Sequence, residues 1–160
     1  MNSKEFKNIF NEIAHKYGFE KAFGSWFKET TECIAVLELQ KSNFGDFYLM
    51  NIKIFIQGAF GKKYMKNKDL AKSSIGHINA NKNQFDKDIF DFDQTIDDVN
   101  RKDKLENLFN EFIIPFTQKV LTKSGIKELA QQGKVFLLPA VEEELKNCNA
   151  LHLLRCQRLE

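Results

Sequence analysis

The residues best spaced for catalysis are two carboxylates in the acidic string Asp91-Phe92-Asp93-Gln94-Thr95. Two carboxylates one residue apart at the end of a strand can share a magnesium ion, and one can act as the nucleophile while the other acts as an acid. The string also has a simpler interpretation. Thr95 can cap a helix, and Asp91 and Asp93 can be solvated acids of the loop before it.

This D-x-D-x-T pattern resembles the nucleophile motif of haloacid-dehalogenase-like phosphatases. In those enzymes the motif closes a buried parallel strand at the start of a large doubly wound domain. Here it follows the charged stretch Asp86-Lys87-Asp88 and begins past the middle of a chain of 160 residues. The context therefore favours a helix entry over a phosphatase site.

Three potential zinc ligands, Cys148, His152 and Cys156, are spaced by four residues on the last predicted helix. Residues four apart on a helix can share a metal. Eight residues, however, rise about 12 Å, which is too far for both sulfur atoms to reach one zinc ion. An interior stripe of the helix explains the same spacing, so we predict no metal site and no cofactor.

The segment Gly58-Ala59-Phe60-Gly61-Lys62-Lys63 follows a predicted strand and has some features of a phosphate-binding loop. A P-loop requires four residues between its glycines and a Ser or Thr after the lysine, and neither condition holds. The basic run that it opens, with Phe60 and Tyr64 interleaved, could contact an anionic partner or single-stranded nucleic acid. The acidic stretch 86–98 offsets much of that charge, so we favour a solvated loop and do not expect a nucleic-acid partner.

The composition is that of a soluble globular domain, with 42% hydrophobic residues, 29% charged residues and a net charge of +2. So small a net charge predicts no general attraction to nucleic acid or to a membrane. Three cysteines without framework spacing indicate a reducing cytoplasm. We expect one domain over residues 1–158, long enough to bury a core, and interpret Leu159-Glu160 as a cloning remnant.

The fold is organised around residues 31–58, which predict two strands joined by a turn at 42–46. Every second residue is apolar, and the intervening residues of the second strand are mixed. This pattern gives a sheet with one apolar face and one wetter face. Further strands are predicted at 19–28, 74–78 and 88–92, with helices from Ser3 to Gly18 and from Thr95 onward, the latter broken or kinked at Pro115. We therefore predict an α+β fold: a twisted antiparallel sheet of four to five meandering strands with helices mainly on one face.

Several of these segments together resemble the bacterial domain of unknown function numbered 4304. The matching features are a helix ending in Gly18-Phe19, a strand ending in Gln40-Lys41-Ser42, and the following strand 47–52 with its asparagine. Weaker similarities are Ile75-Gly76-His77-Ile78 and Ile114-Pro115-Phe116. The resemblance implies an α+β domain of the bacterial cytoplasm, and it brings no established activity or catalytic residue.

No convergent catalytic set is visible, so the first hypothesis is a non-enzymatic module that binds a protein partner through the wetter sheet face. A second hypothesis is a small-molecule binder or undescribed enzyme, with a site between that face and the long helix and with Asn51, His77 and Asp91 as candidates. A third is a homodimer formed through the sheet edge, as opposed to a monomer. The candidate binding residues are Trp26, whose face is uncertain, together with Gln40, Asn51, Lys53, Phe55 and His77.

Overall fold

The structure is a computed structural model, and it describes residues 1–81 and 87–147. Five strands form one antiparallel sheet in the order of the chain: β1 (Glu20–Ala22), β2 (Ser25–Glu29), β3 (Cys33–Lys41), β4 (Tyr48–Ile56) and β5 (Ile78–Asn81). Short turns join β1 to β2, β2 to β3 and β3 to β4, whereas residues 57–77 join β4 to β5, and each strand pairs with the next in the chain, so the order is a meander. The predicted α+β class is confirmed.

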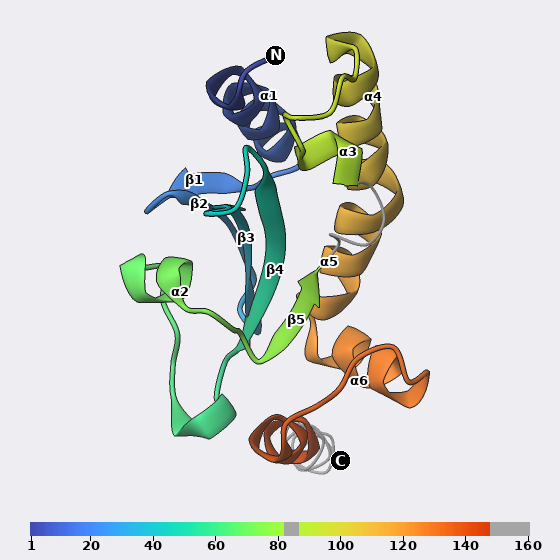
Figure 1. The fold of residues 1–160 in the computed structure, drawn as a ribbon. Helices are drawn as coiled ribbons and strands as arrows, with labels where there is room; N and C mark the ends of the chain where they lie inside the picture. The colour runs from blue at the N-terminus through green and yellow to red at the C-terminus, as the bar shows by residue number, and fades with distance from the viewer. Residues whose placement is uncertain (82–86, 148–160) are drawn as a thin grey trace.

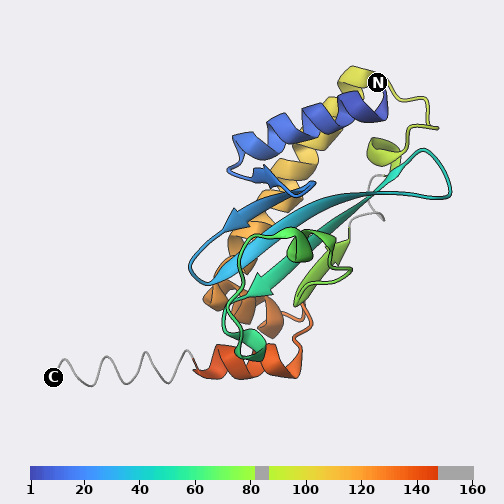
Figure 2. The ribbon, with the colours of Figure 1, turned by 90° about the vertical axis from the view of Figure 1, so that its left-hand side faces the viewer.

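Helices cover one face of the sheet almost entirely (Figure 1). They are α1 (Ser3–Lys16), α3 (Lys87–Phe90), α4 (Asp98–Leu108), α5 (Ile114–Val120) and α6 (Lys123–Gln131), followed by a helical segment at 139–147. Of the described α-helices, α2 (Lys68–Lys72) alone lies on the other face, in front of the sheet in Figure 2. The helical layer follows the apolar side chains of β3 and β4, as predicted.

The main core lies between the sheet and this helical layer. The alternating apolar residues of β3 and β4, from Cys33 to Leu39 and from Tyr48 to Ile56, all point into it. On α1, Phe6 and Phe10 are at most 1% exposed, and the Phe10 ring lies 4.5 Å from Trp26 and 5.3 Å from Phe109. These rings therefore form an aromatic part of the main core.

The predicted first strand at 19–28 is in fact a hairpin. Ala22 pairs with Ser25, so the loop consists only of Phe23 and Gly24. Both have positive φ angles, of 52° and 81°, as a type I′ turn requires. Phe23, predicted to lie within the strand, is consequently 55% exposed at the turn. A phenylalanine is a poor residue for this conformation, and it concealed the turn.

Two other strand boundaries differ from prediction. The strand expected at 74–78 begins only at Ile78. Before it, Gly76 packs directly against the β4 backbone, where a Cβ atom would lie 2.8 Å from the Ile54 nitrogen. The strand expected at 88–92 is the short helix α3, and only Asp91 forms an isolated bridge, with Phe47. The long helix begins at Asp98 under an Asp97 cap, not at Thr95.

Pro115 does not break the long helix. The five residues Phe109–Ile113 (η2) form a π-helical segment between α4 and α5, and the Ile114 amide donates to the Phe109 carbonyl five residues back. A proline lacks an amide hydrogen and crowds the preceding turn. The wider π turn absorbs both effects, so the helix continues past Pro115 with Thr117 and Val120 buried.

Candidate binding site

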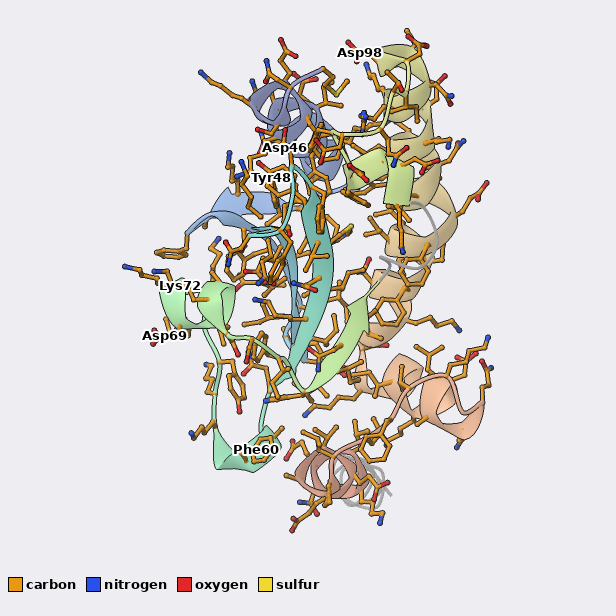
Figure 3. The ribbon with its side chains drawn as sticks, viewed as in Figure 1. Asp46, Tyr48, Phe60, Asp69, Lys72 and Asp98 are labelled. Carbon is orange, nitrogen blue, oxygen red and sulfur yellow. The ribbon has the colours of Figure 1, made fainter. Side chains whose placement is uncertain are left out.

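The wetter face of the sheet is divided into a covered half and an open half. Over the covered half, α2 and the segments on either side of it enclose a second, small apolar cluster. Its members are Phe27, Ile34, Val36, Phe55, Leu70 and Ala71, with Ala22 and Tyr64 at its margin. Figure 3 shows Asp69 and Lys72 on α2, and both side chains are exposed to solvent. The predicted groove on this face is therefore partly filled by the chain itself.

Lys53 lies beneath α2 and is 1% exposed. Its ammonium group donates to the carbonyls of Ala71, at 2.7 Å, and Ser73, at 2.8 Å. It also forms an ion pair with Glu38 across the strands at 3.1 Å. All three ammonium hydrogens thus have acceptors, and Lys53 connects the end of α2 to the sheet.

The remaining sheet-face candidates separate into different environments. Gln40 is exposed and Asn51 half-buried on the open half, where the Asn51 amide donates to Gln40 Oε1 at 3.2 Å. Trp26 lies on the opposite face of the sheet, 2% exposed in the main core, and its indole donates to Asn11 at 2.9 Å. Gln40 and Asn51 are therefore the only candidates of this group that present polar atoms on the open half.

His77 lies just before β5, next to the covered half of the same face. Its ring contacts Phe55, Phe60 and Tyr64 at centroid distances of 4.9 to 5.5 Å. Figure 3 places Phe60 on the turn after β4. The His77 Nδ1 atom accepts the Ile56 amide hydrogen at 2.9 Å, and burial lowers the pKa of this imidazole below its ordinary value. His77 is thus held neutral, with Nδ1 unprotonated, and closes the end of the β4 hydrogen-bonding ladder.

An apolar groove of about 580 Å³ lies along β5, on the side facing the helices. Its strand wall is formed by residues 75–80, and its helical wall by Phe112 and Phe116, whose rings stack at 5.5 Å. The segment 134–138 closes the far side. Two large apolar side chains at the groove are exposed to solvent: Phe136 is 82% exposed and Ile75 is 65% exposed.

The sequence pattern did not predict this groove. Ile75 was predicted only to lie within the strand at 74–78. Only the fold brings 75–80 and 134–138 to the same place, because nothing in their spacing links two segments nearly sixty residues apart. His77 is the one predicted site residue that lines the groove.

A comparison with protein-family models matches residues 10–119 to a domain of unknown function, DUF4304. The chain belongs to this family. The match runs from α1 to α5, so the DUF4304 region includes the whole sheet, α2 and the Phe112–Phe116 wall of the groove. The segments at 123–147 lie beyond it. No curated protein and no solved structure matches the chain.

Within the DUF4304 region, the D-x-D string forms a turn after α3. The Asp91 carboxylate accepts the Asp93 amide at 3.0 Å, and Asp93 in turn accepts the Asp46 amide at 3.3 Å. The buried guanidinium of Arg101 holds four carbonyls of this connection, those of Asp88, Ile89, Asp91 and Gln94. The Asp91 carboxylate thus holds this turn, and the Asp93 carboxylate joins it to the β3–β4 turn.

The zinc interpretation falls on residues 148, 152 and 156, which lie outside the described residues. Within 1–81 and 87–147, no group of three or more His, Cys, Asp or Glu side chains is arranged to hold a metal ion. In the same residues, no helix is both long enough and apolar enough to cross a membrane.

Proposed function

We propose that this DUF4304 protein is a non-enzymatic interaction module that binds an extended segment of a partner protein along β5. The observation that carries the proposal is the combination of an edge strand with an apolar groove beside it. In the described sheet β5 pairs with β4 alone, and Phe136 and Ile75 expose large apolar surfaces at the groove. Exposed apolar surface of this kind is typical of a site for another molecule.

An extended peptide suits both features at once. The outer edge of a strand presents main-chain donors and acceptors, and an added strand supplies their partners. Alternate side chains of that added strand would point toward the helical wall, where the stacked rings of Phe112 and Phe116 form an apolar surface. Main-chain pairing would supply affinity, and the apolar wall would select side chains.

The charges around the groove narrow the class of peptide further. Among the described lining residues Lys134 is the only lysine or arginine, and no carboxylate lines the groove. A partner segment with alternating apolar residues and an acidic group near one end therefore matches it best.

The cysteines support a cytoplasmic location, which belongs to the same proposal. Cys33 is a buried free thiol at the start of β3. Burial, followed by the neighbouring Glu32 carboxylate, raises the pKa of this thiol to about 12. The expectation of a reducing compartment rests on the three cysteines without framework spacing, and a bacterial origin remains the expectation drawn from the family resemblance.

The test is selection from a displayed library of extended eight-residue peptides that alternate apolar and random residues. The affinity of an enriched peptide is then measured for the native protein and for Phe136→Ser, Ile75→Ser and the control Phe44→Ser. Phe44 is 96% exposed at the distant β3–β4 turn, so its replacement is matched to that of Phe136 in type and exposure. We expect about a tenfold loss for Phe136→Ser and Ile75→Ser and no change for the control.

Two further measurements make the selection decisive. Methylating alternate amide nitrogens along one edge of the bound peptide should abolish binding, and methylating those of the other edge should not, if the peptide adds as a strand. Failure to enrich any peptide, or equal affinity for all variants, would refute the proposal. A dimer in solution that becomes monomeric in Phe136→Ser would also refute it, because a second copy would then be the occupant.

A further inference from the structure

A second cavity, polar and basic, lies at the end of the sheet opposite the β3–β4 turn. Its volume is about 700 Å³, and it opens between the start of β3, the turn after β4, the start of α6 and the helical segment 139–147. In both ribbon views the turn after β4, η1 (Ala59–Gly61), lies beside that last segment (Figures 1 and 2). No described residue lines both this cavity and the groove along β5.

The charged side chains that line the cavity are mostly lysines. Among the described residues that line it, Lys62, Lys63 and Lys123 contribute three positive charges and Glu144 one negative charge, which leaves an excess of two positive charges. Lys123 and Glu144 form an ion pair at 2.8 Å, with side-chain exposures of only 14% and 22%. By contrast, Lys62 and Lys63 form no ion pair with any described residue. Both lysines therefore line the cavity without a described carboxylate paired to them.

The turn that carries these two lysines has a fixed shape. Gln57 holds it from both sides, since its side chain accepts the Tyr64 amide at 2.7 Å and donates to the Tyr64 carbonyl at 2.8 Å. Gly58, with a φ of 86°, lies directly against the last helical segment; a Cβ there would come within 2.3 Å of Glu144 Oε1. The lysines are thus presented on a preformed turn, which lowers the entropy lost when a ligand binds.

We infer that this cavity binds a small molecule carrying a phosphate group. Lysine acts as a point charge toward phosphate, and two neighbouring ammonium groups can share the oxygens of one phosphate. Thr31 adds a hydroxyl that makes no hydrogen bond within the described part of the chain, and it lies on the cavity wall. The site differs from a P-loop, because the amides of Gly58 and Gly61 are already used within the turn. Side chains, not backbone amides, would hold the anion.

The experiment measures the binding of inorganic pyrophosphate to the full chain by calorimetry and by changes in amide chemical shifts. We expect saturable binding with shifts at residues 58–63. The double variant Lys62→Gln/Lys63→Gln should weaken binding by about tenfold. The matched control is Lys68→Gln/Lys72→Gln on α2, which removes the same charge from exposed lysines outside the cavity and should leave the affinity within about twofold.

Citrate, an anion of similar charge without phosphorus, separates phosphate recognition from general anion attraction. Weaker binding of citrate than of pyrophosphate supports the assignment. Three results would each overturn it: no saturable binding up to about 10 mM pyrophosphate, an equal loss in both double variants, or citrate binding at least as tightly as pyrophosphate.

Discussion

Replacing Lys53 by methionine tests how the covered half of the sheet is held together. The Lys53 ammonium is buried and donates to the carbonyls of Ala71 and Ser73 and to the Glu38 carboxylate. Methionine retains most of the aliphatic stem, so the packing beneath α2 is largely kept. The change therefore removes three charge-assisted hydrogen bonds and leaves their three acceptors without this donor.

The size of the effect follows from how buried each acceptor is. The hydrogen bond to the Ala71 carbonyl is fully buried, so this acceptor loses its partner without gaining water, at a cost of about 1–3 kcal/mol. The bonds to Ser73 and Glu38 are partly exposed, and those acceptors can be rehydrated. We expect a total loss of about 3 kcal/mol in the free energy of unfolding. For a chain of this length that corresponds to a melting temperature lower by about 6–12 °C.

The assay is urea unfolding at neutral pH, with Glu38→Gln as the control. That control leaves Lys53 bound to its two carbonyls and removes only the charge of a partly exposed carboxylate, so it should cost about 1 kcal/mol or less. Amide hydrogen exchange should accelerate selectively in α2 of the Lys53→Met protein. A Lys53→Met protein within about 1 kcal/mol of the native stability, or a Glu38→Gln protein as unstable as Lys53→Met, would refute the reasoning.

Three other perturbations have expected outcomes. The pKa of His77 is lower in the folded than in the unfolded chain, so the unfolded chain binds the proton more readily. The contribution of His77 to the free energy of unfolding is therefore fully present above pH 6.5 and decreases as the pH falls below that value. Urea midpoints of the native protein should show this slope, and those of His77→Asn should show less of it. Gly76→Ala should destabilise by about 2–4 kcal/mol in the same assay, because its Cβ would meet the β4 backbone. In a protein with the other cysteines replaced by serine, Cys33 should resist alkylation at about pH 8 until the protein unfolds. Mass spectrometry measures the extent of alkylation.

Each of these has its own control or contrary result. Gly24→Ala meets no atom within 4 Å, and only its φ of 81° opposes the change, so it should cost about 1–2 kcal/mol. Equal costs for the two glycine variants would show that the contact with β4 is unimportant. A His77→Asn protein with an unchanged pH slope would assign that slope to other groups. Rapid alkylation of Cys33 in the folded protein would contradict its burial.

The strongest sequence signals led to the correct architecture. Two nine-residue strands with an apolar residue at every second position defined the apolar face, and the side on which the helices pack followed from it. Local steric detail was harder to read. The Phe23-Gly24 hairpin was missed because phenylalanine rarely adopts positive φ, and the aromatic residues around it fitted a single strand equally well.

The binding candidates depended on contacts that alternation does not encode. Lys53 and Phe55 occupied wetter-face positions, as expected, yet α2 returns from residues 68–72 and covers them. Trp26 could not be assigned a face, because the hairpin before it changes the register of the strand. Both proposed sites use segments beyond residue 120, so they became visible only when the fold placed those segments beside β5 and η1.

The π-helical segment before Pro115 sets the rotational phase of everything that follows it in the long helix. One residue of an α-helix corresponds to a rotation of about 100°. A π turn takes up about one residue more than an α turn, so deleting one residue within 109–113 would leave the phase of α5 unchanged, whereas closing the segment into a regular α-helix with all five residues kept would turn α5 by about that angle. Thr117 and Val120 would then leave the core, and Phe116 would no longer stack on Phe112 at the groove. The extra residue taken up by the π turn therefore determines whether the groove wall exists, independently of which side chains form it.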